Sequence, residues 1–312
     1  MMEIPEVPSE RRSMPRTVTP LSVPAITDIN LLRFPLKQDA LHALVRGALQ
    51  EDGAFNDLTT IATVVSDRRS RAKIVAREAG VICGVPLALE AVRILDGKAS
   101  VRVEHEDGAS VKPGEQIVFI TGHARGLLSA ERVALNYLQR LSGIASITAK
   151  YVEAVKGTNA HILDTRKTTP GWRALEKYAV RAGGGMNHRM DLSSGVLIKD
   201  NHLAALDGDV TKAVTRAREL APPGIKIEVE CDHVEQVVRA VDAGADIILL
   251  DNMSTDLLTE CVSLVQGRAI LEASGGVKLD NVRAIAETGV DWISVGALTH
   301  SPRALDLAMD FE

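Results

Sequence analysis

The chain has 312 residues, of which 46% are hydrophobic and 25% charged, so it can bury a core without disulfides or structural metal ions. Only 3% of the residues are aromatic and the formal net charge is -5. This composition argues against a surface that stacks single-stranded bases and against a basic face that binds a phosphate backbone. Any strongly cationic site must therefore be local.

The N-terminal segment differs in kind from the rest of the sequence. Five of the twelve prolines lie within it: Pro5, Pro8, Pro15, Pro20 and Pro24. Because proline fixes φ and lacks an amide donor, we expect residues 1–26 to form a disordered tail. The segment has acidic residues near its start and no apolar stretch typical of a secretory signal. No apolar run in the chain approaches the roughly 20 residues that cross a bilayer.

The cysteines lack the close spacing of a zinc site, and three of them cannot all pair within one chain. They are Cys83, Cys231 and Cys261. We therefore expect reduced thiols in a cytoplasmic protein.

Residues 27–128 predict a small α+β unit. Leu41, Val45 and Leu49 recur at four-residue spacing, which predicts an amphipathic helix over residues 37–50. Alternating or apolar stretches with turn residues between them predict short strands and a second helix. In chain order these are a strand at 71–77, an apolar run at 81–85, a helix at 89–95, and strands at 101–104 and 116–121.

From residue 129 onward, strands and helices alternate. A long helical period covers residues 129–156, with Gly143 as a candidate break, and helical segments such as 233–243 and 280–288 follow later. The strand candidates are 161–165, 195–200, 226–231, 246–252, 269–275 and 292–298. This alternation predicts a parallel sheet, either closed into a barrel or open and doubly wound.

The ends of these strands favour the barrel. Five of them end on polar or charged residues, and in a barrel the carboxyl ends of all strands converge on one face. In an open sheet the outer strand ends would lie far apart. The span is short for eight βα units, so we expect fewer than eight strands.

Cationic side chains follow several of the strands. Arg166 and Lys167 come after the first, His188 and Arg189 follow a glycine-rich loop, and Lys199 ends the next strand. Clustered cations repel one another by about 4 kcal/mol per pair at 4 Å in an effective dielectric near 20, unless anions lie between them. The sequence therefore predicts a polyanionic substrate. The Gly183-Gly184-Gly185 run itself fits a helix C-cap and a flexible loop better than a nucleotide-binding fingerprint.

Acidic side chains end the following strands. Glu228 and Glu230 alternate with Val229, so both face the same side of their strand, and Asp251 ends the next apolar run. These acids either form ion pairs with Lys199 or Lys167 or hold a hard cation such as magnesium through oxygen ligands. The residues alone leave both roles open.

Small residues end the last two strands, at Ser274-Gly275-Gly276 and at Ser294-Val295-Gly296-Ala297. Free backbone amides at the start of a following helix favour an anion, and the last two strands of a barrel often build a phosphate site. A simple tight turn is the alternative.

Taken together, these segments resemble the quinolinate phosphoribosyltransferase family, also called nicotinate-nucleotide pyrophosphorylase (carboxylating). The resemblance covers about residues 37–312. It is carried in order by AERVALNYLQRLSGIAS, ILDTRKTTPGWRALEKYAVRAGGGMNHRMDLSSGVLIKDNH, IEVE, LLDNM, LEASGG and ISVGALTHS.

The resemblance implies a fold and a reaction. The fold is an N-terminal open α/β sandwich, residues 27–128 joined by a returning segment at 302–312, and an incomplete barrel of about seven strands over residues 129–301. The reaction converts quinolinate and phosphoribosyl pyrophosphate to nicotinate mononucleotide, pyrophosphate and carbon dioxide, with Mg²⁺, on the route to NAD. The enzyme would be a homodimer or a larger assembly of dimers with shared sites.

The resemblance also implies roles for individual residues. Quinolinate would be bound by Arg166, His188, Arg189 and Lys199, and by Arg132 of a partner subunit. Lys167 would lie near the pyrophosphate, and Glu230 and Asp251 would engage the ribose, the magnesium ion and the charge that builds on C1. The 5′-phosphate would lie against Ser274, Gly275, Gly276, Gly296 and Ala297.

Three alternatives stay open at this stage. A phosphoribosyltransferase of the same fold that uses nicotinate, or a molybdenum-transport-associated homologue, should need fewer cations. A Schiff-base aldolase would use Lys199 or Lys167 as a covalent nucleophile. A catalytically inactive dimeric binding protein should lack one of the cations or carboxylates, and none is missing.

Overall fold

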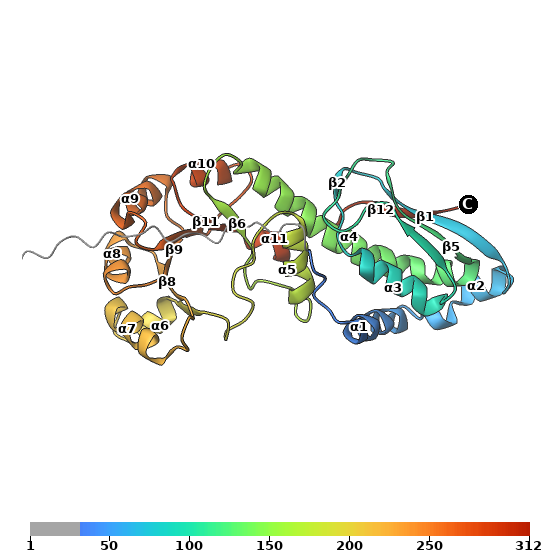
Figure 1. Cartoon of the computed structure of the whole chain (residues 1–312), viewed down its shortest axis with the longest axis horizontal. Helices are drawn as coiled ribbons and strands as arrows, with labels where there is room; N and C mark the ends of the chain where they lie inside the picture. The colour runs from blue at the N-terminus through green and yellow to red at the C-terminus, as the bar shows by residue number, and fades with distance from the viewer. Residues whose placement is uncertain (1–31) are drawn as a thin grey trace, which may run out of the picture.

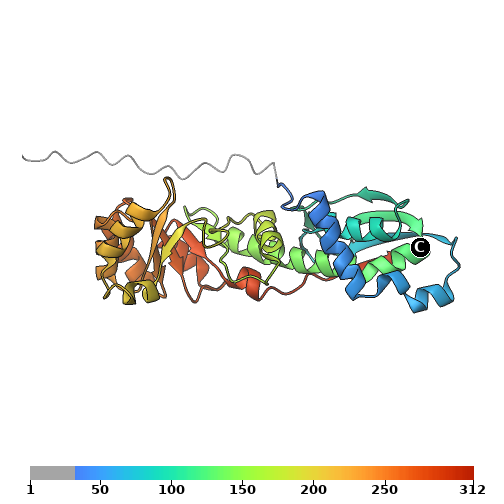
Figure 2. The same ribbon diagram turned by 90° about the horizontal axis from the view of Figure 1, so that it is seen from below.

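The computed structural model describes residues 32–312, so the predicted tail at residues 1–26 lies outside the described residues. Figures 1 and 2 show an elongated molecule with two lobes that are joined by one long helix. Within residues 32–312, no helix combines the length and the apolar composition needed to cross a membrane.

The first lobe is an antiparallel sheet covered by helices. Its four strands lie in the order β12-β1-β5-β3. Their bounds are β1 Arg69–Ala76, β3 Ser100–Val103, β5 Gln116–His123 and β12 Leu307–Phe311. Side chains in β1 alternate as expected, and Ala72, Ile74 and Ala76 are fully buried. A small ladder pairs β2 (Gly80–Val81) with β4 (Ser110–Val111).

The C-terminal strand completes this first sheet. β12 pairs with the last five residues of β1, from Ala72 opposite Phe311 to Ala76 opposite Leu307. The chain therefore returns to its own N-terminal unit, as the resemblance implies. The helices of this lobe are α1 Gln38–Glu51, the 3-10 turn η1 Ala54–Asn56, α2 Leu58–Thr63 and α3 Val85–Leu95.

The apolar run at 81–85 turns out to be divided between two elements. Val81 ends β2, whereas Val85 begins α3. Gly84 between them has φ 105°, a left-handed conformation that redirects the chain. Pro86 then lies in the first turn of the helix, where its missing amide costs nothing. Helix α3 therefore begins four residues before the pattern at 89–95 predicts.

The long helix is continuous, so the candidate break at Gly143 is wrong. α4 runs over Ala124–Ala154, 31 residues, and joins the two lobes (Figure 1). Gly143 is needed for a close approach instead. A Cβ at this position would lie 2.2 Å from the Arg303 carbonyl oxygen, in the segment that leads to β12.

Gly143→Ala is expected to lower the free energy of unfolding by about 1–3 kcal/mol, because backbone rather than a flexible side chain blocks the added methyl group. Gly47→Ala in α1 is the matched control, since nothing lies within 4 Å of its Cβ position. Gly47→Ala should stabilise the protein by about 0.5–1 kcal/mol through helix propensity. Urea unfolding measures both. Equal stability of Gly143→Ala and wild type would show that α4 does not press on residue 303.

The second lobe contains a parallel sheet of six strands in the order β6-β11-β10-β9-β8-β7. Their bounds are β6 His161–Leu163, β7 Val196–Ile198, β8 Ile227–Cys231, β9 Ile247–Asp251, β10 Ile270–Ser274 and β11 Trp292–Ser294. A single parallel bridge from Met186 to Leu163 adds a seventh segment at the edge. Among the described residues no ladder joins that segment to β7, so the barrel is incomplete, as expected.

Helices connect and surround these strands, as the alternation predicts. They are α5 Arg173–Ala182, α6 Asp200–Ala204, α7 Val210–Leu220, α8 Val234–Asp242, α9 Thr255–Val265, α10 Val282–Glu287 and α11 Ala297–His300. Gly183 is the C-cap of α5, and Gly184 after it has φ 85°, which fits the helix C-cap interpretation of the glycine run. The parallel order places the carboxyl ends of all six strands on one side of the barrel.

Candidate active site

A cavity of about 860 Å³ opens at the carboxyl ends of the barrel strands. Every predicted site residue except one contributes to its wall. Those residues are Arg166, Lys167, His188, Arg189, Lys199, Glu230, Asp251, Ser274, Gly275, Gly276, Gly296 and Ala297. Residues from seven separate strand ends or loops therefore meet in one place, which is the outcome that a barrel predicts and an open sheet does not.

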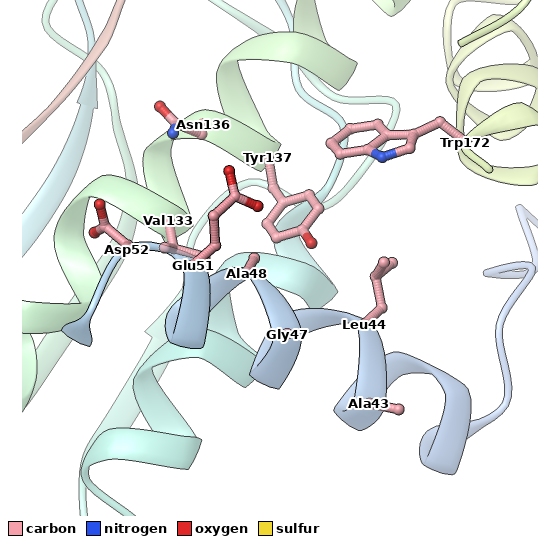
Figure 3. A pocket seen from close by; sticks show the side chains of 10 residues that line it. All are labelled: Ala43, Leu44, Gly47, Ala48, Glu51, Asp52, Val133, Asn136, Tyr137 and Trp172. Carbon is pink, nitrogen blue, oxygen red and sulfur yellow. The ribbon is translucent and has the colours of Figure 1, made fainter. Parts of the chain in front are cut away.

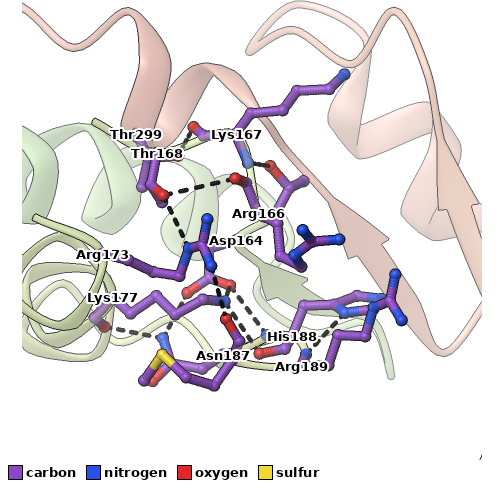
Figure 4. A network of polar contacts seen from close by, with 12 residues as sticks. Asp164, Arg166, Lys167, Thr168, Arg173, Lys177, Asn187, His188, Arg189 and Thr299 are labelled. Carbon is purple, nitrogen blue, oxygen red and sulfur yellow. Dashed lines mark hydrogen bonds and ion pairs between the residues drawn. The ribbon is translucent and has the colours of Figure 1, made fainter. Parts of the chain in front are cut away.

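Cations gather on one side of this cavity. Arg166 follows β6, and Arg189 follows the bridge at Met186 (Figure 4). The Nε atoms of both guanidinium groups are buried and have no hydrogen-bond partner in the structure. Burial lowers the pKa of Arg189, and the neighbouring Arg166 charge lowers it further. Buried donors without acceptors cost free energy, so this side of the cavity is suited to carboxylates.

Lys199 forms an ion pair with Glu230 across β7 and β8. Of the two roles that the sequence leaves open for the acids, Glu230 therefore has the ion-pair role. Asp251 lies at the end of the neighbouring strand β9, and its Oδ2 accepts a hydrogen bond from Asn252 Nδ2 at 2.6 Å. Mg²⁺ usually binds one or two protein carboxylates and completes its shell with water and substrate phosphate oxygens. Two carboxylates on adjacent strand ends, open to a cavity, fit that mode.

Small residues at the ends of β10 and β11 line another part of the cavity wall. Gly275 and Gly276 follow β10 with φ of 88° and 61°, and a Cβ on Gly275 would lie 2.2 Å from the Asn252 side-chain oxygen. Gly296 precedes α11, and a Cβ there would press on Lys167 and His300 at 3.2 Å. Larger residues would fill this space, so the glycines keep it open for a ligand that approaches the backbone.

Two buried carboxyl groups lie beside His188: that of Glu228, which the sequence singles out, and that of Glu272, which it does not. His188 Nε2 lies 3.2 Å from a Glu228 oxygen and 3.5 Å from a Glu272 oxygen. Burial alone lowers the pKa of His188, but the hydrogen bond to Glu228 and the charge of Glu272 outweigh it and the net shift is upward. Burial raises the pKa of Glu272 to about 8, and the Glu228 charge adds to this effect.

Glu272→Gln should change how stability depends on pH. Between about pH 4.5 and about pH 8 the folded wild type keeps a proton on Glu272 that the unfolded chain releases, so its free energy of unfolding falls as pH rises. Glutamine cannot titrate, so the variant should gain stability relative to wild type across this window. Urea unfolding at about pH 5.5, 7 and 8.5 measures the difference. Parallel curves would show that folded Glu272 is already ionised.

Arg132 is the predicted residue that the fold does not bring to this cavity. It lies on α4 with 60% of its side chain exposed, 4.0 Å from Glu131, and it is not part of the cavity wall of its own chain. The contribution of Arg132 to the site of a partner subunit therefore stays a prediction.

A second cavity, of about 550 Å³, lies between α1 and α4 in the first lobe (Figure 3). Tyr137 and Trp172 stack at its edge with ring centroids 5.3 Å apart, and Glu51 and Asp52 line the other end. It contains none of the predicted site residues, so the barrel cavity is the candidate active site.

Sequence comparisons identify one family for both lobes. The family model described as "Quinolinate phosphoribosyl transferase, N-terminal domain" matches residues 57–142, and that described as "Quinolinate phosphoribosyl transferase, C-terminal domain" matches residues 144–310. The nicotinate-nucleotide pyrophosphorylase [carboxylating] of Mycobacterium leprae is 45% identical over 278 residues, which cover 87% of this chain and 97% of the relative. A quinolinate phosphoribosyltransferase [decarboxylating] of Nicotiana tabacum is 38% identical over 321 aligned positions, covering 96% and 91%.

Solved structures give the same result. The structure of the nicotinate-nucleotide pyrophosphorylase from Francisella tularensis matches with a TM-score of 0.84 and 38% identity, covering 89% of this chain and 98% of that one. Human nicotinic acid phosphoribosyltransferase matches with a TM-score of 0.55 and 10% identity, covering 84% and 73%, which shows a shared fold alone.

Proposed function

The chain belongs to the quinolinate phosphoribosyltransferase family, and we propose that its barrel cavity joins quinolinate to the ribose of phosphoribosyl pyrophosphate in NAD biosynthesis. The products are nicotinate mononucleotide, pyrophosphate and carbon dioxide. The observation that carries the proposal is a pair of arginines, Arg166 and Arg189, whose buried Nε atoms have no hydrogen-bond partner. Quinolinate has two adjacent carboxylates, which match two such groups better than the single carboxylate of nicotinate.

The cavity wall supports an arrangement of the two substrates. Quinolinate lies among Arg166, His188, Arg189 and Lys199, and Arg132 of a partner subunit covers it. The 5′-phosphate lies against Ser274, Gly275, Gly276, Gly296 and Ala297, where the backbone is open. Lys167 lies beside Gly296 and reaches the pyrophosphate. Both substrates are anionic, so the cationic wall also favours their entry.

Catalysis in this arrangement depends on positioning and electrostatics, without a covalent nucleophile. The pyridine nitrogen forms a bond to C1 of the ribose as the bond from C1 to pyrophosphate breaks. Glu230 and Asp251 stabilise the positive charge that builds on C1. The ring nitrogen is then positively charged, so the adjacent carboxylate leaves as carbon dioxide, its electron pair stays on the ring carbon, and that carbon takes a proton.

Mg²⁺ is part of the proposal. Glu230 and Asp251 are the residues that would hold it, partly through water and substrate oxygens, and it would neutralise charge on the departing pyrophosphate. We also propose a homodimer or a higher assembly of dimers in the cytoplasm. The three unpaired, buried cysteines support a reducing compartment.

The decisive experiment is carbon dioxide release from carboxyl-labelled quinolinate with phosphoribosyl pyrophosphate, with and without Mg²⁺. We expect release only when both substrates and Mg²⁺ are present, and no mononucleotide from nicotinate. Equal use of nicotinate would contradict the proposed substrate. A covalent adduct trapped by borohydride would support the Schiff-base aldolase alternative instead.

A further inference from the structure

The loop that carries His188 and Arg189 is hydrogen-bonded to a buried ion pair. Neither residue of this pair is among the proposed substrate-binding residues. Lys177 lies on α5 with 1% of its side chain exposed, and Asp164 follows β6 with none exposed. The two side chains form a salt bridge. Neither residue lines the barrel cavity.

Both members of the pair also bind the main chain of His188 (Figure 4). Asp164 Oδ1 accepts the His188 amide hydrogen at 3.0 Å, and Lys177 Nζ donates to the His188 carbonyl oxygen at 3.0 Å. Asn187 closes the network, because its Nδ2 donates to Asp164 Oδ2 at 2.5 Å and to the Lys177 carbonyl oxygen at 2.8 Å. The peptide groups on both sides of His188 are therefore fixed to α5 and to the end of β6.

Stability alone does not explain a charged pair at this place. Burial raises the pKa of Asp164 and lowers that of Lys177, so both charges are held at a cost. Apolar residues of similar volume often replace a buried ion pair without loss of stability. His188, however, lies outside the strand ladders, and its amide and carbonyl need an acceptor and a donor. The Asp164–Lys177 pair supplies one of each, which an apolar pair would not.

The geometry points to Lys177 as a positioning residue for the proposed quinolinate site: with Asp164 it fixes the main chain of His188 and so aims the guanidinium of Arg189 into the cavity. This inference rests on the proposed function. Arg189 follows His188 directly, and its Nη1 donates to the Gly195 carbonyl oxygen at 2.8 Å, so the side chain spans the loop. The phosphate side of the cavity lies on β10 and β11 and makes no contact with the pair among the described hydrogen bonds.

Lys177→Met tests the inference by separating the two substrates. The KM for quinolinate is expected to rise by about 10- to 100-fold, because a small misplacement of a binding group is costly. The KM for phosphoribosyl pyrophosphate should stay within about twofold, because all of its proposed contacts except Lys167 lie at the ends of β8 to β11. Tyr178→Phe is the matched control. It removes a 2.8 Å hydrogen bond to Asp107 from the next residue of the same helix, and it should leave both KM values unchanged. A parallel rise of both KM values in Lys177→Met, or no rise, would overturn the inference.

Asn187→Ala keeps the test decisive if Lys177→Met does not fold. This variant removes two hydrogen bonds and leaves the ion pair in place, so a rise of about three- to tenfold in the quinolinate KM alone is expected. An unchanged quinolinate KM would overturn the inference.

Amide hydrogen exchange gives a readout that needs no activity. The segment with His188 and Arg189 should exchange faster in both variants than in wild type, but not in Tyr178→Phe. Unchanged exchange would overturn the inference. Faster exchange in a protein whose wild type releases no carbon dioxide would instead place the failure in the proposed function.

Discussion

Glu230→Gln and Asp251→Asn are each expected to lower kcat by about 10²- to 10³-fold, the usual loss when one preorganised electrostatic group is removed from an active site. Both carboxylates lie at the ends of adjacent strands, and both line the cavity. The amide variants keep size and shape, so the fold should tolerate them. The KM values should change less than kcat, because the charge on C1 exists only in the transition state.

Measurements of stability and of a matched control variant distinguish a specific loss of catalysis from a general disruption of the fold. Glu235→Gln on α8 removes an exposed carboxylate close to Glu230 in sequence but outside the cavity, and it should behave as wild type. The free energy of unfolding should differ by less than about 1 kcal/mol for Asp251→Asn. Glu230→Gln leaves Lys199 without its partner, so a somewhat larger change is expected there. Wild-type turnover in both cavity variants would exclude the proposed roles in metal binding and charge stabilisation.

The second large effect that we expect is the return of activity when two inactive variants form mixed dimers. Arg132→Ala and Arg189→Ala should each be nearly inactive alone, because each removes a cation from every site of a dimer with shared sites. After subunit exchange at equal amounts, about a quarter of wild-type activity should return, since half of the dimers are hybrids with one intact site in two. The exposed position of Arg132 on α4, away from the cavity of its own chain, is the basis for this expectation.

The controls for this experiment concern exchange itself. Mass-tagged subunits must show hybrids by native mass spectrometry before activity is compared. Mixing Arg166→Ala with Arg189→Ala should restore nothing, because both residues line the cavity of the same chain. Confirmed hybrids without regained activity would contradict a site shared between subunits.

Most of the site residues that can be predicted from the sequence lie at the ends of strands. Arg166, Lys199 and Asp251 lie at or within three residues of the carboxyl ends of apolar strands, and the rule that parallel strand ends converge is enough to predict that they meet. The two lobes and the parallel sheet followed equally from the change in hydrophobic period. Alternation also predicted that Glu228 and Glu230 face one side, and both lie inside the barrel.

The residues that were missed depend on tertiary neighbours. Glu272 lies in the middle of β10, and the alternation of Leu271, Glu272 and Ala273 places it on one face without telling which partners it meets there. Lys177 lies in a helix whose charged residues suggest a solvent face. α5 instead packs against α4 and the barrel, so Glu176 and Lys177 are both buried. Gly143 was misjudged because the segment that crosses it lies 160 residues later in the chain.

The return of β12 to the first sheet has a consequence for synthesis on the ribosome. The first three strands of that sheet have emerged by residue 123, but its edge strand begins only at Leu307. At 5–20 residues per second, roughly 180 residues of delay leave the edge of β1 unpaired for about 10–40 s in each new chain. An exposed strand edge is a site of aggregation. The last residues of the chain, far from the chemistry, therefore decide how long that edge stays open in the nascent protein.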